Sequence, residues 1–478
     1  MVRPYDFPPL GMMYLSSILK ESGYHVEVVT AQYNQLKKRL LKEEDLSKVI
    51  LAYSVMTFEA EYFLRLNRRI KKEFKVFSVF GGSHPTFFPE MIEEDGVDAV
   101  CIGEGEYSLP DLVDRLKRGK EIRTTKNYWV KQEGVIYKNP LNELVSDLDE
   151  IPFPDRDLFR STSFQHTIMA SRGCLFNCSY CFNHAYNKLY DNCPKEVRIR
   201  SIGNIIKELF EMKRNNLLKN SWVSFIDSNF ISDTEWLKEF AYQYKNKINI
   251  PFTVNVHPNL VTDKGLDYLK KADCFLIRLG IESGSFEVRK NILKRPVTDE
   301  QIIKACRMIK ERGFLLRTYN MLGIPGSTID DDYKTIELNI RCKPTATVPQ
   351  MMCPYPKTEM YVAAQKLGLL SNNFSFGSKN PSTLRFSQVK FNNKKDKLMI
   401  ENLHKLSPLV INFPGLLPLT KLLIRLPNNL VFYLIFYFFS LYVDNIKLTP
   451  SRSHIFSIKA MRNLGKGIKK TIYLCRTE

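Results

Sequence analysis

Two successive series, in each of which short apolar runs alternate with helical stretches, constrain the fold of this chain more than any other feature. The first series covers residues 10–116, and the second begins near residue 167 and continues to residue 322. Such alternation favours parallel sheets covered by helices, because consecutive parallel strands need a crossover connection that a helix can supply. We therefore expect an α/β protein with two sheets.

The first series predicts a Rossmann-like, doubly wound parallel sheet within residues 1–130, with strands at 49–54, 76–80 and 97–102. Two glycine-containing turns directly follow the last two of these strands. Open α/β sheets bind ligands at the carboxyl ends of their strands, so the turns form a candidate binding site. The candidate residues are Gly81, Gly82, His84, Pro85, Thr86, Gly103, Glu104 and Gly105.

Residues 131–165 are polar and irregular, and they contain two closely spaced prolines, Pro152 and Pro154. Prolines at this spacing interrupt regular structure, so we interpret the segment as a linker. The second series, within residues 166–390, predicts a partial or full (β/α) TIM-like barrel. Its active site is expected at the carboxyl ends of the strands.

The last predicted region, residues 391–478, is a basic and apolar helical tail. The chain carries a formal net charge of +19, and this region holds 14 basic residues against 4 acidic ones. Its apolar run at 430–443 is shorter than the roughly 20 residues that span a bilayer. The run fits either a buried helix or a helix on a membrane surface. Because the charge excess lies largely in the tail, it gives little support to nucleic-acid binding.

Three of the ten cysteines are clustered as Cys174-x3-Cys178-x2-Cys181, directly after a predicted strand. The low cysteine density and the lack of an apolar leader predict a cytoplasmic protein without a disulfide framework. Three thiolates can ligate three irons of a four-iron cluster and leave the fourth iron open to another ligand. A zinc site with His184 as the fourth ligand is the alternative.

With Tyr180 just before the last cysteine, this motif resembles the signature of radical S-adenosylmethionine (radical SAM) enzymes. The resemblance implies a [4Fe-4S] cluster on Cys174, Cys178 and Cys181, whose open iron binds S-adenosylmethionine. In that family an electron from the reduced cluster cleaves a C–S bond, and the resulting 5′-deoxyadenosyl radical abstracts a hydrogen atom.

Further segments resemble the same superfamily and occur in the expected order at 225–230, 280–285 and 323–326. The glycines in the last two segments permit turns and close backbone approach, and Glu282 offers a carboxylate suited to ribose hydroxyls. The resemblance implies that the S-adenosylmethionine site includes Tyr180, Glu282, Ser283, Gly284, Gly323 and Gly326.

The N-terminal part is similar to the cobalamin-binding domain of one large radical SAM subclass, through residues 8–11 and the two turns at 81–86 and 103–106. The resemblance implies a cobalamin site at these turns. Two departures are notable. The Asp-x-His-x-x-Gly motif of modules with a histidine ligand is missing, and the first strand of the sheet is expected to be missing as well. His84 fits either a cobalamin-facing residue or a simple turn residue.

By resemblance, the activity is methylation of an unactivated carbon, with radical cyclisation or rearrangement, as in tetrapyrrole cyclases, as the alternative. An RNA-modifying enzyme and a non-catalytic cofactor-binding protein are alternatives from other classes. RNA-modifying relatives carry three further cluster cysteines in the N-terminal domain, whereas only Cys101 precedes Cys174 here. The implied partners are a small, potentially hydrophobic substrate, an electron donor such as flavodoxin or ferredoxin, and no nucleic acid. Peripheral membrane contact through the tail is an open alternative.

Overall fold

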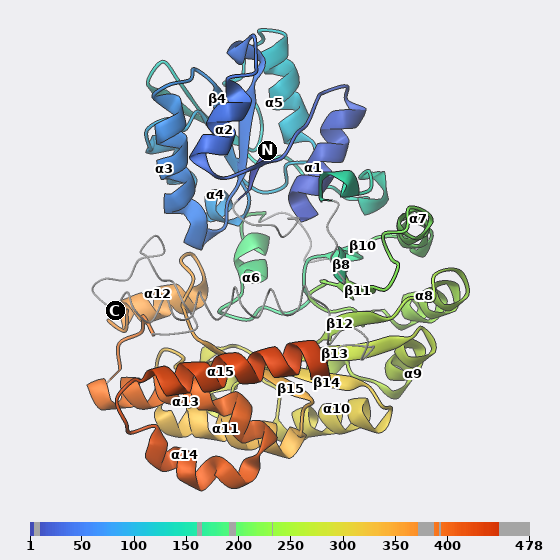
Figure 1. Cartoon of the computed structure of the whole chain (residues 1–478), viewed down its shortest axis with the longest axis vertical. Coiled ribbons are helices and arrows are strands. Elements are labelled where there is room, and N and C mark those ends of the chain that lie inside the picture. The colour runs from blue at the N-terminus through green and yellow to red at the C-terminus, as the bar shows by residue number, and fades with distance from the viewer. Residues whose placement is uncertain are drawn as a thin grey trace. The chain divides into compact units, whose positions relative to one another are not determined.

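The computed structural model describes residues 1–3, 10–159, 165–190, 197–231, 233–370, 387–391 and 393–448. These residues form two compact units, one composed mainly of residues 1–162 and the other mainly of residues 163–478. Each unit contains its own large sheet (Figure 1).

The first unit is built around a seven-stranded sheet. Its first five strands in spatial order are parallel, and the last two are antiparallel to their neighbours. In spatial order the strands are β2 (Val29–Thr30), β1 (Val2–Arg3), β3 (Ile50–Ser54), β4 (Phe77–Gly81), β5 (Ala99–Cys101), β6 (Tyr128–Gln132) and β7 (Val135–Lys138).

Alternating side chains of this sheet enter two separate apolar cores. Phe80 and Val100 pack with the residues of helices α2 and α3, whereas the neighbouring Val79 and Ala99 pack with helix α5 on the other face. Strands whose two faces are both buried by helices confirm the predicted doubly wound arrangement. The helices are α1 (Leu10–Glu21), α2 (Tyr33–Leu40), α3 (Ala60–Lys71) and α5 (Ser108–Lys117).

Two expectations about the first unit were wrong. The first strand is present, because Val2 pairs with both Val29 and Tyr53 as β1. The linker interpretation fails for the β6–β7 hairpin, which extends the sheet through a turn at Glu133 and Gly134. Both turn residues have positive φ, 54° and 79°, as in the tight turns that match strand twist. A Glu-Gly pair between alternating apolar residues was the sequence signal for this hairpin.

The second unit contains a six-stranded, all-parallel sheet whose strands follow one another in chain order. Its edge strands, β8 and β15, are not paired with each other in the described part of the chain, so the barrel is partial. Two short strands, β9 (Ser171–Arg172) and β10 (Arg198–Ile199), form a separate antiparallel pair. The six strands are β8 (Gln165–Ile168), β11 (Trp222–Phe225), β12 (Phe252–Val256), β13 (Cys274–Glu282), β14 (Leu315–Leu322) and β15 (Ala346–Met351).

Helices cover one face of this partial barrel and share its main apolar core (Figure 1). Each begins at a Ser, Thr or Asp whose side chain accepts a backbone N–H of the first turn, which ends the preceding loop at a defined residue. The helices are α7 (Ile202–Arg214), α8 (Thr234–Lys247), α9 (Asp263–Lys271), α10 (Asp299–Glu311) and α11 (Ile329–Cys342).

The C-terminal region is helical, as predicted, but its apolar helix is only partly buried. Helix α13 packs against β15 and α11, whereas Phe432 is the only buried residue of α15. Residues 430–443 are therefore half-buried: α15 packs on α13, while Leu430, Val431, Phe438 and Tyr442 are exposed, so the helix is not the fully buried one of the first alternative. None of the described helices is long and apolar enough to cross a membrane. The helices are α12 (Glu359–Lys366), α13 (Lys394–Asn412), α14 (Leu417–Leu423) and α15 (Leu430–Tyr442).

Candidate functional site

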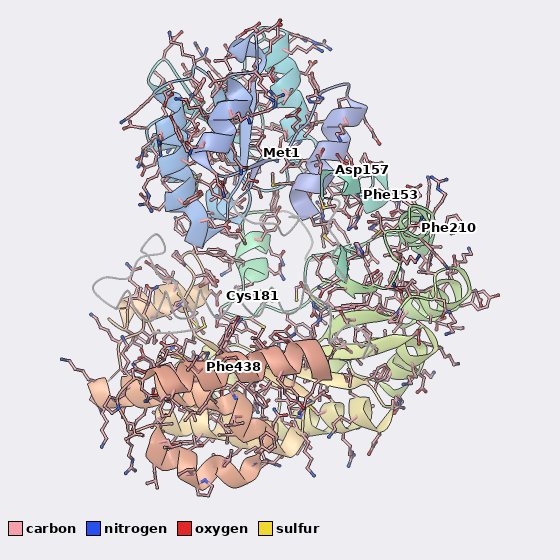
Figure 2. The ribbon with its side chains drawn as sticks, in the orientation of Figure 1. Met1, Phe153, Asp157, Cys181, Phe210 and Phe438 are labelled. Carbon is pink, nitrogen blue, oxygen red and sulfur yellow. The ribbon has the colours of Figure 1, made fainter. Side chains whose placement is uncertain are left out.

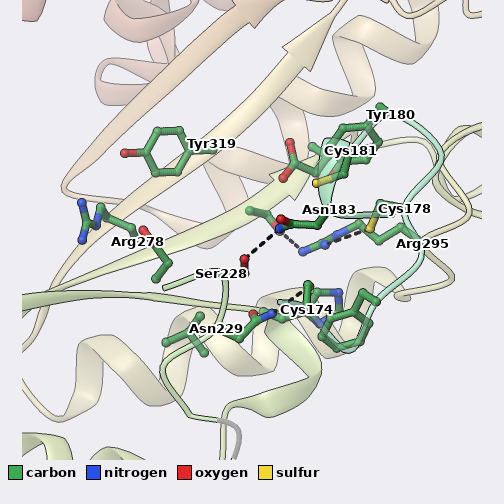
Figure 3. Close-up of a pocket in the computed structure, with 16 residues that line it drawn as sticks. Cys174, Cys178, Tyr180, Cys181, Asn183, Ser228, Asn229, Arg278, Arg295 and Tyr319 are labelled. Atoms are coloured by element: carbon green, nitrogen blue, oxygen red, sulfur yellow. Dashed lines mark hydrogen bonds between the residues drawn. The ribbon is translucent and has the colours of Figure 1, made fainter. Parts of the chain in front are cut away.

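The three clustered cysteines border one cavity of about 280 Å³ in the second unit (Figure 3). They lie on the loop between β9 and the short helix α6 (Phe182–Asn187). The rest of the lining comes from the carboxyl ends of β11, β12 and β13, from β14, and from the loops that follow. The cavity therefore lies where the active site of a (β/α) barrel is expected.

Five of the lining residues were predicted from the sequence, namely Cys174, Cys178, Tyr180, Cys181 and Glu282, and Asn229 and Gly280 lie in the segments 225–230 and 280–285 that resemble the superfamily. The others are mostly polar residues from segments far apart in the chain, which only the fold brings together. These additional polar lining residues are Asn183, Ser228, Asn229, Asn255, His257, Arg278, Arg295 and Tyr319.

Glu282 enters the cavity through an irregularity at the end of β13. The register of β13 against β14 shifts between Gly280 and Glu282, and Glu282 has a positive φ of 70°. Strained backbone of this kind is concentrated at functional sites. The Glu282 side chain folds back towards Gly280, and a Cβ at position 280 would overlap the Glu282 carboxylate. A residue without a side chain at position 280 leaves room for this carboxylate. Burial raises the pKa of Glu282, while the positive charge of Arg295 opposes that shift.

Arg295 lies between the cysteines and Glu282. Its guanidinium donates to the Gly280 carbonyl oxygen at 2.8 Å and to the Cys178 Sγ at 3.8 Å. Its Nε is buried and has no hydrogen-bond partner among the described residues. A buried donor without a partner is costly, so this group is suited to contact a bound ligand.

His257 is a second buried donor at the cavity and is only 4% exposed. Its ring stacks on Phe176 of the cysteine loop, with ring centroids 3.6 Å apart. Nδ1 accepts the backbone N–H of Asn259 at 3.2 Å, which places the proton on Nε2, and Nε2 has no partner among the described residues. Burial, followed by the charge of Arg295, lowers the pKa of His257 to about 2, so the ring is neutral.

The loop after β11 contributes Asn229, whose side chain donates to the Cys174 Sγ at 3.5 Å. Across the same cavity, Asn183 donates to the Ser228 hydroxyl at 2.8 Å (Figure 3). Asp227 does not line the cavity and instead accepts from the Ala170 N–H and the Ser171 hydroxyl. Of Asp227 and Asn229, only Asn229 contacts a cysteine.

Four residues implied for S-adenosylmethionine, Ser283, Gly284, Gly323 and Gly326, do not border this cavity. Gly284 packs tightly against the backbone at Lys334. The Gly323 N–H donates to the buried Asp332 carboxylate at 3.0 Å. The Ser283 carbonyl oxygen accepts from the Arg289 guanidinium at 2.7 Å. Ser283, Gly284 and Gly323 therefore have structural roles in the turns around the cavity.

His184, the fourth ligand in the zinc alternative, has both ring nitrogens in hydrogen bonds. Nδ1 lies 3.1 Å from the Asn177 side-chain oxygen, and Nε2 lies 3.0 Å from Glu359. No three His, Cys, Asp or Glu residues in the described ranges converge closely enough to hold a single metal ion. A four-iron cluster needs a wider arrangement, because each thiolate binds a different iron. The three thiols around one cavity fit that group better than they fit zinc.

The two glycine-containing turns of the first unit meet at the carboxyl ends of β4 and β5. The Thr86 hydroxyl donates to the Gly82 carbonyl oxygen at 2.8 Å and accepts the Gly103 N–H at 3.1 Å. Gly82 has a φ of 99°, and a Cβ there would lie 3.0 Å from the backbone nitrogen of Val55. The structure thus joins the two predicted turns into one surface at the expected edge of the sheet.

Other residues of these turns have internal contacts. His84 stacks on Phe88 with centroids 4.7 Å apart, and its buried Nδ1 has no partner among the described residues. Burial lowers the pKa of His84 to about 4. The Glu104 carboxylate accepts the Val145 N–H at 2.9 Å. Gly105 lies close to Leu15, since a Cβ on this glycine would be 3.3 Å from the leucine side chain. Gly81 is the last residue of β4, and Pro85 is buried in the short helix α4 (Ser83–Phe87).

The fold and the site define a class of protein: two α/β units, one with a doubly wound sheet and the other with a parallel half-barrel that carries three cysteines at a strand-end cavity. The model of the radical SAM superfamily matches residues 168–338, and that of the B12 binding domain matches residues 1–113. The chain belongs to the radical SAM superfamily and carries a B12-binding domain ahead of the radical SAM core.

Known proteins resemble most of the chain. An uncharacterized methyltransferase of Pyrococcus horikoshii, PH0819, is 28% identical over 381 residues, which are 76% of this chain and 80% of that protein. The structure of the radical S-adenosylmethionine methyltransferase TsrM from Kitasatospora setae, with cobalamin and a [4Fe-4S] cluster bound, superposes with a TM-score of 0.68. It is 16% identical and covers 99% of each chain. The anaerobic magnesium-protoporphyrin IX monomethyl ester cyclase of Synechocystis is 22% identical over 189 residues, 37% of this chain and 38% of that protein.

Proposed function

We propose that this protein is a cobalamin-dependent radical SAM methyltransferase that methylates an unactivated carbon of a small molecule. The observation that carries the proposal is the cavity in which Cys174, Cys178 and Cys181 meet buried donors that have no protein partner. The two family matches and the methyltransferases among the relatives support the same activity. A cyclase matches about a third of the chain, so cyclisation has weaker support than methylation.

In this proposal the three cysteines hold a [4Fe-4S] cluster, which supplies one-electron reductive cleavage of S-adenosylmethionine when bound. Glu282 and Arg295 lie beside the cysteines and offer a carboxylate and a guanidinium to the charged and hydroxylated parts of that cosubstrate. Burial raises the pKa of the Cys174 and Cys181 thiols, the latter to about 11. Metal binding at neutral pH therefore releases protons from these thiols.

Cobalamin, the proposed methyl carrier, would be held by residues 81–86 and 103–105. The buried, unpartnered Nδ1 of His84 and the joined turns at the strand ends support this site. The limits of the cobalamin-binding domain, residues 1–130, and of the barrel, residues 166–390, are part of the same proposal. A small one-electron carrier such as flavodoxin or ferredoxin would reduce the cluster.

The direct test is anaerobic purification and reconstitution of the full chain with iron, sulfide and hydroxocobalamin, followed by metal analysis. We expect four irons and one cobalt per chain. Four irons without cobalt would remove the methyl-transfer mechanism and leave a radical SAM enzyme of another kind. A chain that holds no iron after reconstitution would contradict the proposal altogether.

Replacing any one of the three cysteines tests their assignment. Cys174→Ala, Cys178→Ala and Cys181→Ala should each abolish formation of 5′-deoxyadenosine from S-adenosylmethionine, because a lost thiolate leaves a second iron without its protein ligand. Cys193→Ala, at a position outside the described residues, should retain the wild-type rate. An equal loss in Cys193→Ala would show that the ligands are assigned wrongly.

We further propose that helices α14 and α15 contact an anionic membrane surface. Leu422, Val431 and Phe438 are 62%, 60% and 46% exposed, and they belong to a region that is apolar over much of its length. Residues 402–443 hold no acidic side chain, whereas Lys421 and Arg425 are basic and exposed. Apolar side chains flanked by basic ones favour the interface of a negatively charged leaflet.

Vesicle sedimentation of the full chain tests this contact. The protein should pellet with mixed phosphatidylglycerol–phosphatidylcholine vesicles, and the double variant Val431→Asp/Phe438→Asp should remain in the supernatant. Phe210→Asp is the matched control, because Phe210 is 55% exposed on α7, and Figure 2 labels both phenylalanines. Equal binding of the double variant, or no binding of the wild type, would contradict the proposal. Concentration-dependent self-association without vesicle binding would assign the face to a second copy of the chain.

A further inference from the structure

Two of the three clustered thiols accept hydrogen bonds from side chains outside their own loop. The Asn229 amide donates to the Cys174 Sγ at 3.5 Å, and the Arg295 guanidinium donates to the Cys178 Sγ at 3.8 Å. Figure 3 shows both contacts, which approach the cysteine loop from different parts of the cavity wall. Neither donor belongs to the cysteine motif itself.

The Asn229 donor is held in place by the loop that carries it. The Phe230 N–H donates to the Asn255 carbonyl oxygen at 3.0 Å, and the Asn255 side chain donates to the Asp227 carbonyl oxygen at 2.8 Å. These two bonds fasten both sides of Asn229 to β12. The amide therefore needs little rearrangement to remain directed at Cys174.

Arg295 is equally constrained and is 8% exposed. Its Nη2 donates to the Gly280 carbonyl oxygen at 2.8 Å, while Nη1 faces Cys178. A permanent positive charge and an N–H donor thus lie beside one thiolate of the cysteine motif.

Hydrogen bonds to the sulfur ligands are among the features that set the reduction potential of an iron–sulfur cluster. Reduction adds one electron, and its negative charge spreads partly onto the sulfur atoms. Donors that point at those atoms stabilise the reduced form more than the oxidised form, because the charge they contact has increased. The potential therefore rises with each such donor.

We propose that Asn229 and Arg295 raise the reduction potential of the cluster on Cys174, Cys178 and Cys181, so that a small protein electron donor can reduce it. One electron passes from that donor, which is oxidised, to the cluster, which is reduced, and no covalent bond is formed or broken in this step. The inference rests on the proposed function, because it requires the cluster. It adds two residues that set how readily the cluster accepts an electron.

An anaerobic redox titration monitored by electron paramagnetic resonance tests the inference on the full, reconstituted chain. Asn229→Leu keeps the approximate side-chain volume but removes the donor, so its midpoint potential should be more negative than that of the wild type. Asn183→Leu is the matched control, since the Asn183 side chain lines the same cavity but donates to Ser228, and the variant keeps the backbone N–H that contacts Cys181. Its potential should equal that of the wild type.

Arg295→Met provides a second test if Asn229→Leu does not retain its cluster, and it should shift the potential in the same negative direction. Iron and sulfide analysis before each titration distinguishes a failure of the proposed function from a failure of this inference. A wild-type chain without iron would overturn the proposed function. Full iron content with wild-type potentials in both Asn229→Leu and Arg295→Met would overturn this inference alone, as would an equal shift in Asn183→Leu.

Discussion

At the scale of single residues, two glycines of the same motif have different reasons to be glycine. Gly280 leaves room for the Glu282 carboxylate, which lines the cavity, so its role belongs to the site. Gly284, only four residues later, lies against the backbone at Lys334 and donates its N–H to the Thr335 hydroxyl at 2.8 Å. The motif therefore combines one residue that shapes the site with one that packs β13 against α11.

This difference predicts the effect of adding a single methyl group. In Gly284→Ala the Cβ would overlap the Lys334 carbonyl oxygen, so we expect the free energy of unfolding to fall by about 3 kcal/mol. Gly203→Ala, in helix α7, places its Cβ no closer than 3.9 Å to another group and should change stability by less than about 1 kcal/mol. Urea unfolding followed by circular dichroism measures both. Equal stabilities would show that α11 moves aside at little cost.

At the scale of elements, helix α13 buries an unusual row of polar side chains. Asn402, His404 and Lys405 are fully buried on this helix, and Glu401 is 3% exposed. The Asn402 amide donates to the carbonyl oxygens of Ile424 and Leu426, which attaches the segment before α15 to α13. Such networks stabilise one arrangement because each buried polar group needs its own partner.

His404 makes this element sensitive to acid. Burial, assisted by the charge of Lys405, lowers the pKa of His404 from its ordinary 6.5 to about 4. Between pH 4 and pH 6.5 the unfolded chain binds more protons at this histidine than the folded chain does. The contribution of His404 to the free energy of unfolding is therefore complete above pH 6.5 and falls as the pH drops towards 4, by at most about 1.4 kcal/mol per pH unit. His404→Gln can keep a donor to the Pro349 carbonyl oxygen without titrating. Urea unfolding at pH 7 and pH 5 should show a smaller loss in His404→Gln, and an equal loss would contradict the assignment.

At the scale of the whole molecule, the two units have separate apolar cores, and the chain carries a net charge of +19. Residues 449–478 contribute seven basic residues and one acidic residue to this charge. The cavity at Cys174, Cys178 and Cys181 is a small site lined by residues of one unit.

We expect any binding of transfer RNA to depend on charge alone. Affinity should fall by at least about a hundredfold between 50 and 200 mM salt, because such binding consists mainly of counterion release. Removing residues 449–478 should reduce the slope of this salt dependence. Filter binding at several salt concentrations measures both effects. Tight binding of one transfer RNA that persists at 200 mM salt would instead support the RNA-modifying alternative.

The sequence by itself determined the features that depend on local patterning. The spacing of Cys174, Cys178 and Cys181 predicted the candidate site, and the alternation of apolar runs with helical stretches predicted both sheets. Strands β3 and β4 begin and end within one residue of the predicted 49–54 and 76–80, because a short apolar run bounded by polar residues fixes the position of a buried strand. The β6–β7 hairpin was missed because its two short apolar strands lie at the start of a longer polar stretch with two prolines, which was interpreted as a linker throughout.

Only the tertiary structure decided which distant residues join the cysteines. His257 and Arg295 come from two separate βα segments, and nothing in their local sequence distinguishes them from residues of an ordinary loop, whereas Asn229 lies in the 225–230 segment that resembles the superfamily. They meet because parallel strands direct their carboxyl ends to one edge of the sheet. The exposure of α15 was decided in the same way, since an apolar run contains no information about which neighbours cover it.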